Sequence, residues 1–343
     1  MEHFLVLRFG ILSMNAVAMY SWQGNGNLGD DWIGQIGKIE FPDSYPVHEY
    51  RDPKRFAHQN YRLRKSRFSL RDIRDPIVLW GGGWLASDRG TNESINRWLQ
   101  HLERTNVPVF GFGLGVGPFT LGDSSHDELL NRLQAPLYVR STADLEYADK
   151  AAHLSGDVVF LDSRIPLLES QTTLHGLVGL SLPRYSPHWA LTRPWITEKW
   201  YRDRVAAYIA AAPQGSKVLF IEFSAGSSFK DSDSYYWREL DALFVKPRNE
   251  LEAAEFMRSC DSFLAGRLHA GFLAALSGIP TVGLAYHHKF LALAETGIPV
   301  EGIREEPTDL VKPLQADPRA VEKIRARTRL CLEQLKRALS EAV

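Results

Sequence analysis

Cysteine is scarce in this chain of 343 residues. It has only two, Cys260 and Cys331, and neither belongs to a CxxC pair. Disulfide-rich scaffolds and thiolate zinc sites need closely spaced cysteines, so the sequence disfavours both. We therefore expect a protein of a reducing compartment, the cytoplasm, whose fold depends on apolar packing.

An excess of charge of either sign is also lacking. Lys and Arg number 40, Asp and Glu number 41, and the net charge at pH 7 is -1. This balance provides no general attraction to nucleic acid, so we expect no nucleic-acid partner and only local anion sites.

One segment, residues 51–74, departs from this balance. Its basic residues are Arg51, Lys54, Arg55, Arg62, Arg64, Lys65, Arg67, Arg71 and Arg74. Charge runs are usually solvated surfaces. The alternative is that this segment contacts an anionic acceptor or lipid head groups at a membrane surface.

Long apolar runs are missing as well. No window approaches the roughly 18 to 20 uninterrupted apolar residues of a membrane-spanning helix. The N-terminal segment is apolar, but Glu2, His3 and Arg8 interrupt it, which disfavours a signal peptide. Translation could start at Met14 instead of Met1, and the sequence leaves both starts open.

The chain does contain a repeated order of apolar strand, glycine-rich or polar loop, and helix. The expected strands are 16–21, 76–80, 107–112, 136–140, 158–161, 177–182, 217–223, 262–265 and 281–286. Such repeats are typical of α/β proteins with doubly wound parallel sheets. The pattern lapses over 162–174, so we expect domains at 1–165 and 166–317, followed by a C-terminal helix over 318–343.

The most informative stretch is 260–290, which predicts a βαβ unit with its helix over 268–276. Arg267 and His269 follow the first strand, and the second strand is followed by His287, His288 and Lys289. Ligands of parallel sheets bind beyond the carboxyl ends of the strands, and a helix N-terminus favours an anion there. The stretch therefore predicts a site for a small phosphorylated acid.

Glycines mark further loops at strand ends. Gly24, Gly26 and Gly29 satisfy the GxGxxG pattern of dinucleotide-binding oxidoreductases, but no strand ending in an acidic residue follows at the expected distance. In the other interpretation, Asn27 and Asp30 of this loop hydrogen-bond a polar ligand or cap a helix. Glycines that would let a ligand approach the backbone of the later loops are Gly82, Gly83 and Gly115.

Six motifs in order resemble the polysaccharide pyruvyl transferase family. They are GNLGDD, GGGWL, GFGLGVGP, VRS, GDVVFLD and GRLHAGFLAALSGIPTVGLAYHHK. The resemblance implies a GT-B-like fold, in which two Rossmann-like domains face a central cleft, with the acceptor on the N-terminal side and the donor on the C-terminal side. It also implies phosphoenolpyruvate as donor substrate, no cofactor, and a sugar acceptor in a polysaccharide or its lipid-linked precursor.

The resemblance also assigns residues. The RLH motif of the family falls on Arg267, Leu268 and His269, its lysine on Lys289, and the arginine of its VRD-type segment on Arg140. Guanidinium and ammonium groups suit the anions of the donor. An imidazole, with a reference pKa of about 6.5, suits proton transfer at neutral pH.

The VRS segment departs from the family, because Ser141 stands where an acidic residue is common. We expect His269, Arg267 and Asp30 to be catalytic. The substrate-binding candidates are Arg140, Lys289, Leu268, Ser141, Asn27, Gly82, Gly83 and Gly115.

No metal is expected, since His287 and His288 are adjacent and lack a partner at helical spacing. The leading hypothesis is transfer of the enolpyruvyl group of phosphoenolpyruvate to a sugar, with formation of a pyruvate ketal and release of phosphate. The alternative enzyme is a GT-B glycosyltransferase with a nucleotide-sugar donor. A catalytically silent binding protein is a third hypothesis.

Overall fold

The computed structural model describes residues 17–21, 27–47, 73–82, 100, 106–117, 125–148, 152–167, 176–187, 189–224, 232–303 and 310–342. Several predictions lie outside these residues. They concern Met14, Gly24, Gly26, Gly83 and most of the basic segment 51–74.

The N-terminal half contains a sheet of four parallel strands in the order β2-β1-β3-β4. These strands are β1 (Ala18–Tyr20), β2 (Tyr45–Val47), β3 (Ile77–Trp80) and β4 (Val109–Phe112). A parallel pair, β5 (Leu137–Val139) and β6 (Ala152–Leu154), lies next to β4. An isolated bridge joins Val139 of β5 to Leu114, which follows β4. Among the described residues of this half, the α-helices are α1 (Leu28–Glu40), α3 (Ser125–Arg132) and α4 (Thr142–Leu145).

The C-terminal half contains six parallel strands in the order β12-β11-β10-β7-β8-β9. They are β7 (Leu177–Ser181), β8 (Lys217–Ile221), β9 (Ala242–Val245), β10 (Ser262–Ala265), β11 (Thr281–Leu284) and β12 (Val300–Glu301).

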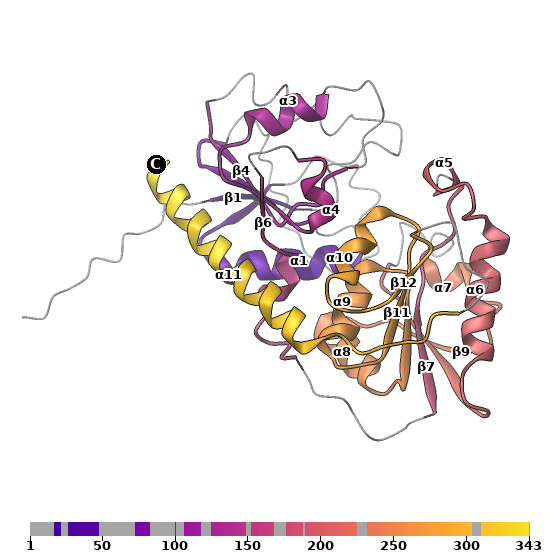
Figure 1. Ribbon diagram of the computed structural model, residues 1–343. Coiled ribbons are helices and arrows are strands. Elements are labelled where there is room, and N and C mark those ends of the chain that lie inside the picture. The colour runs from indigo at the N-terminus through magenta and orange to yellow at the C-terminus, as the bar shows by residue number, and fades with distance from the viewer. Residues whose placement is uncertain are drawn as a thin grey trace, which may run out of the picture.

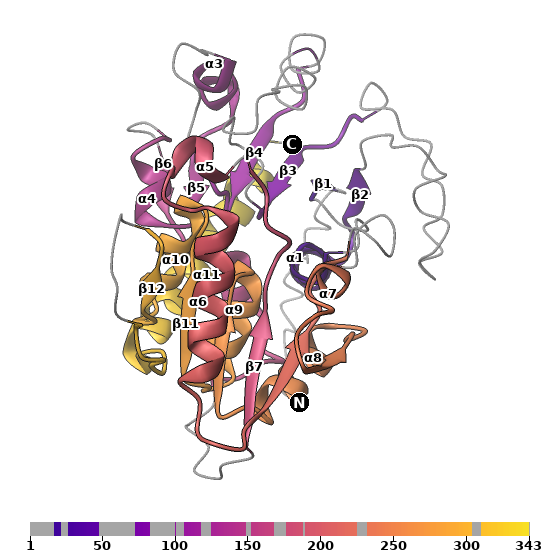
Figure 2. The ribbon, with the colours of Figure 1, turned by 90° about the vertical axis from the view of Figure 1, so that its right-hand side faces the viewer.

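Helices lie on both faces of the six-stranded sheet, with α6 on one side and α8 and α9 on the other (Figures 1 and 2). The helices of this half are α5 (Trp189–Thr192), α6 (Glu198–Ala210), α7 (Asp233–Tyr236), α8 (Glu250–Arg258), α9 (Leu268–Leu276) and α10 (Leu291–Ala294). Two parallel sheets flanked by helices confirm the predicted α/β, GT-B-like plan.

One predicted strand is wrong. Residues Val158–Leu161 form a 3-10 helix, η3, and the strand of this region is β6, which precedes it. Asp157 caps η3, because its side chain accepts a hydrogen bond from the backbone of Val159. All four side chains of η3 are buried, since the segment packs between α1 and α11, and a continuous apolar run of this length is typical of a buried strand as well.

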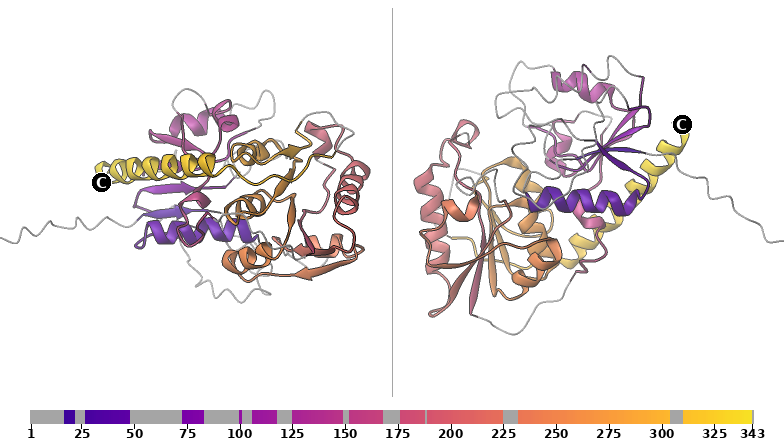
Figure 3. Two further views of the ribbon diagram at one scale, coloured as in Figure 1. Left: turned by 60° about the horizontal axis from the view of Figure 1, so that its bottom comes forward. Right: turned by 180° about the vertical axis from the view of Figure 1, so that it is seen from behind.

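The last helix, α11 (Pro318–Glu341), returns from the C-terminal half to the N-terminal half (Figures 1 and 3). Arg329 and Lys336 form ion pairs with Glu40 of α1, at 2.7 and 3.2 Å. A single apolar cluster includes side chains of α1, η3, α11 and the six-stranded sheet, so the two halves share a core. Among the residues described, no helix has the length and apolar character needed to cross a membrane.

Candidate functional site

Two helix N-termini meet where the halves of the molecule join. Asn27 caps α1 by accepting from the backbone of Gly29, and the backbone N–H of Leu28 donates to the carbonyl of Phe223 beyond β8. Helix α9 begins directly after β10, and the imidazole of His269 in its first turn lies against Gly29. A Cβ atom on Gly29 would lie 2.3 Å from Nδ1 of His269, so only glycine leaves room for this ring.

His269 faces a buried carboxylate with its other nitrogen. Its side chain is 12% exposed, and Nε2 lies 3.5 Å from Oδ2 of Asp157, which belongs to the N-terminal half. Neither atom has a hydrogen-bond partner among the described residues, and catalytic hydrogen bonds often tighten only when a substrate binds. Burial acts to raise the pKa of Asp157, but its contact with His269 and the charge of Arg140 outweigh burial and hold that pKa below its usual range.

Arg140 lies between two carboxylates. Its side chain is 2% exposed, with Nη1 3.6 Å from Asp157 and Nε 3.8 Å from Asp144. We expected this guanidinium to bind the donor directly, but the structure buries it and neutralises its charge. In this arrangement Arg140 reaches His269 only through Asp157.

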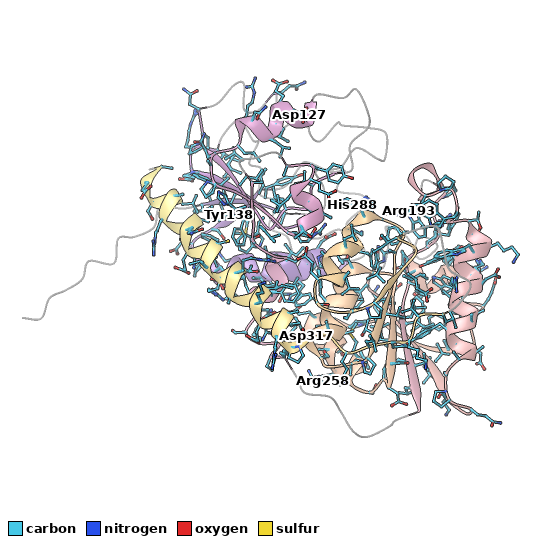
Figure 4. All side chains as sticks on the ribbon, in the orientation of Figure 1. Asp127, Tyr138, Arg193, Arg258, His288 and Asp317 are labelled. Carbon is cyan, nitrogen blue, oxygen red and sulfur yellow. The ribbon has the colours of Figure 1, made fainter. Side chains whose placement is uncertain are left out.

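Asp144 supplies the acidic group that the VRS segment lacks. Its carboxylate accepts from the hydroxyl of Ser141 and from the backbone N–H of Val116. It also lies 3.7 Å from Nε2 of His288, which Figure 4 labels near the junction of the two halves. Ser141 is fully buried, so its side chain serves this network and is not open to a ligand.

Arg267, which precedes α9, is held by Asp233 at the start of α7. Its Nε and Nη2 donate to the two carboxylate oxygens at 2.9 and 2.7 Å. This paired geometry raises the pKa of Arg267 further above its already high value, against the effect of burial, so the guanidinium is charged. Among the described residues, none accepts a hydrogen bond from Nη1.

Asp30 lies in the first turn of α1, among several cationic groups. Burial raises its pKa from 3.8 to about 6, although the charges of His269, Lys289 and Arg267 oppose this change. Three groups from the start of α9 and from the short helix after β11 therefore act on one carboxyl group of α1. A carboxyl group with such a pKa can exchange protons near neutral pH.

Lys289 lies in the short 3-10 helix η5 (His288–Phe290), after β11. His287 caps η5 by accepting from the backbone N–H of Lys289, and the ammonium group lies 5.1 Å from the ring centre of Tyr286. The structure thus brings His269, Arg267, Asp30 and Lys289 to the same region, while their roles in catalysis and binding stay predictions.

The remaining candidates are backbone positions or buried side chains. Gly82 accepts a hydrogen bond from the backbone N–H of Gly115, so these two glycines join the loops after β3 and β4. Leu268 is buried in the apolar core, which favours packing over contact with a substrate. Within the described residues, no group of three or more His, Cys, Asp or Glu could hold a metal ion.

Three carboxylates of the candidate site were missed from the sequence: Asp144, Asp157 and Asp233. Each is almost fully buried and pairs with a cationic side chain from another element or loop. The available signal was position at a short helix, because Asp157 directly precedes one and Asp233 begins another.

Comparison with known protein families identifies a match. A model described as polysaccharide pyruvyl transferase matches residues 27–288. No protein of curated function matches the sequence.

Among solved structures, HepE of Anabaena in complex with UDP-glucose is 13% identical, with a TM-score of 0.49 over 95% of this chain and 98% of that one. The UDP-GlcNAc 2-epimerase of Methanocaldococcus jannaschii is 11% identical, with a TM-score of 0.45 over 92% and 98%. The glycosyltransferase WaaG is 14% identical, with a TM-score of 0.38 over 95% and 93%. At these values, nothing about activity follows from the similarity.

Proposed function

Because the chain belongs to the polysaccharide pyruvyl transferase family, we propose that it transfers the enolpyruvyl group of phosphoenolpyruvate to a sugar, forming a pyruvate ketal and releasing phosphate. The proposed acceptor is a sugar of a polysaccharide or of its lipid-linked precursor. The family membership supports pyruvyl transfer in general, and the donor and the ketal product are the specific parts of this proposal.

The observation that carries the proposal is the group of opposite charges around Asp30. His269, Lys289 and Arg267 all lie close enough to lower the pKa of this carboxyl group, and burial nevertheless raises it to about 6. The site thus combines a carboxyl group that titrates near neutral pH with an imidazole and two cations. Ketal formation needs both a proton donor and a proton acceptor next to an anion-binding site.

The donor carries a carboxylate and a phosphate, and three features suit these anions. The ammonium group of Lys289 provides a point charge, and Nη1 of Arg267 provides a donor beside its pair with Asp233. The first turn of α9 adds backbone N–H groups, and the N-terminus of each of the helices α1 and α9 adds the positive end of a helix dipole.

The chemistry then needs four bond changes. His269 gives a proton to the methylene carbon of phosphoenolpyruvate, and one sugar hydroxyl attacks the cationic C2 as Asp30 takes its proton. The C2–O bond to phosphate breaks, and phosphate leaves with the bonding electron pair. A second hydroxyl attacks C2 and returns a proton to His269, while the proton on Asp30 passes to phosphate or solvent.

The test is incubation of the protein with phosphoenolpyruvate and candidate sugar acceptors, followed by measurement of inorganic phosphate and of the acceptor mass. We expect His269→Asn to lower kcat by about 10² to 10⁴. His153→Asn, at an exposed position on β6, is the matched control and should retain kcat.

Two outcomes would contradict the proposal. A nucleotide sugar that is consumed in the presence of acceptor, with phosphoenolpyruvate left unchanged, would make the chain a glycosyltransferase. Release of phosphate that is the same with His269→Asn as with the unmodified protein would remove this histidine from the reaction.

A further inference from the structure

The imidazole of His269 is fixed on two opposite sides. On one side, Nε2 is enclosed and lies 3.5 Å from Oδ2 of Asp157. On the other side, Nδ1, Cβ and Cγ pack against the α-carbon of Gly29 at the start of α1. The ring therefore cannot turn over without leaving one of these contacts, so its two nitrogens have different surroundings.

Asp157 is itself held in place. It is 1% exposed, its Oδ1 accepts from the backbone N–H of Val159 at 3.2 Å, and its Oδ2 also faces Nη1 of Arg140 at 3.6 Å. Arg140 is braced in turn by Asp144. Burial disfavours the ionised form of Asp157, but His269 and Arg140 lower its pKa below the usual range, so the carboxylate is ionised at neutral pH.

An ionised carboxylate only accepts hydrogen bonds, and a neutral imidazole carries one N–H. The nitrogen that faces Asp157 must therefore carry that hydrogen. The other nitrogen, Nδ1, then has the lone pair that can take up a proton and, after protonation, the N–H that can donate it.

We propose that Asp157 is the positioning residue of His269, which keeps the ring hydrogen on Nε2 so that the proton of the reaction moves through Nδ1. This inference rests on the proposed function, in which His269 transfers a proton to and from the substrate. It assigns Arg140 to the support of Asp157 and gives Gly29 the task of leaving space beside the reacting nitrogen.

The first experiment determines the tautomer of His269 and does not depend on enzymatic activity. ¹⁵N NMR of the imidazole in the unmodified protein, above the pH at which the ring is charged, should show the hydrogen on Nε2. In Asp157→Asn the amide can donate to Nε2, so we expect the hydrogen to move to Nδ1 in part or completely. A hydrogen on Nδ1 in the unmodified protein would overturn the inference, whether or not the variant folds.

The second experiment measures kinetics. We expect Asp157→Asn to lower kcat by about 10² to 10⁴. In a His–Asp pair, replacing the carboxylate with an amide favours the wrong tautomer of the histidine and reduces catalysis by factors in this range. The KM for phosphoenolpyruvate should change less than about threefold, since ground-state binding of the donor is assigned to other groups. A loss of kcat with the tautomer unchanged would show a merely structural role and overturn the inference.

Asp162→Asn is the matched control. Asp162 is equally buried, caps the other end of η3, and pairs with Arg164 and Trp32 without contact to His269. It should leave the tautomer unchanged and kcat within about threefold. If the unmodified protein shows no reaction with phosphoenolpyruvate, the proposed function fails, while the NMR result still decides the role of Asp157.

Discussion

The contact between Gly29 and His269 predicts that a single methyl group abolishes most of the activity. In Gly29→Ala, the new Cβ would lie 2.3 Å from Nδ1 and 2.7 Å from Cβ and Cγ of His269, whereas an ordinary contact needs at least 3.4 Å. The ring would therefore have to move by about 1 Å, away from α1. A displacement of about 1 Å in a reacting group can cost about 10² in rate, and we expect kcat to fall by that factor.

Gly37→Ala provides the matched control in the same helix. Its Cβ would lie 2.2 Å from Sδ of Met19 and 3.0 Å from the Trp80 ring, a similar overlap at the other end of α1. Overpacking costs about 1 to 3 kcal/mol, so both variants should lose stability in urea unfolding. Only Gly29→Ala should lose kcat for phosphate release at a temperature where both are folded. Equal kcat values for the two variants would refute the location of the reacting group at this contact.

Three further predictions concern charge and packing. Burial raises the pKa of Asp30 from 3.8 to about 6, so the unmodified protein loses stability as the pH rises between these values. Asp30→Asn should lower kcat, yet it should raise the free energy of unfolding by about 1 to 3 kcal/mol at pH 7. Below pH 4 the variant should have no effect on stability, and urea unfolding at both pH values measures the difference. Arg164→Leu leaves two buried carboxylates without their cationic partner and should lower the free energy of unfolding by about 3 to 5 kcal/mol. Arg248→Leu removes an exposed pair and should lower it far less, so equal losses in urea unfolding would contradict this reasoning. Leu335 is buried on the packed face of α11, so Leu335→Ala should lower the free energy of unfolding in urea by about 2 to 5 kcal/mol. Leu330 is 61% exposed on the same helix, so Leu330→Ala should leave the free energy of unfolding almost unchanged.

Most of the fold could be predicted from the sequence, because the βαβ units are local. The strand at Ser262–Ala265, the helix at Leu268–Leu276 and the strand beginning at Thr281 follow from apolar runs separated by Gly and Pro. The prediction of a strand at Val158–Leu161 failed because the four buried side chains of this segment pack against α1 and α11, which are distant in the chain. Burial on all sides removes the periodicity that distinguishes a short helix from a strand.

The edge strands β9 and β12 were missed for a different reason. Residues Ala242–Val245 are only partly buried, with Leu243 and Phe244 exposed, and Val300–Glu301 is too short to show a pattern. Both form strands because a neighbouring strand of the sheet offers backbone partners. Such pairing depends on the assembled sheet and leaves little trace in the local sequence.

The candidate site could be predicted where a helix N-terminus or a strand end marks it. His269, Lys289 and Asp30 were found in this way. The partners of the arginines could not, because a sequence shows that a side chain is charged but not which distant side chain neutralises it. Arg267 meets Asp233, which lies 34 residues away in the chain.

The ion pairs of Arg140 and Arg267 bear on how the proposed donor site would bind anions. Arg140 and Arg267 were expected to hold the carboxylate and the phosphate of the ligand together with Lys289, yet each arginine lies against at least one buried carboxylate. A buried cation without such a partner would cost several kcal/mol before any ligand bound, so the pairs keep the empty site stable. In the proposed reaction, binding of the anions then depends on Lys289, on the remaining nitrogen of Arg267 and on the N-terminus of α9, whose backbone N–H groups are fixed in place and need no counter-charge when the site is empty.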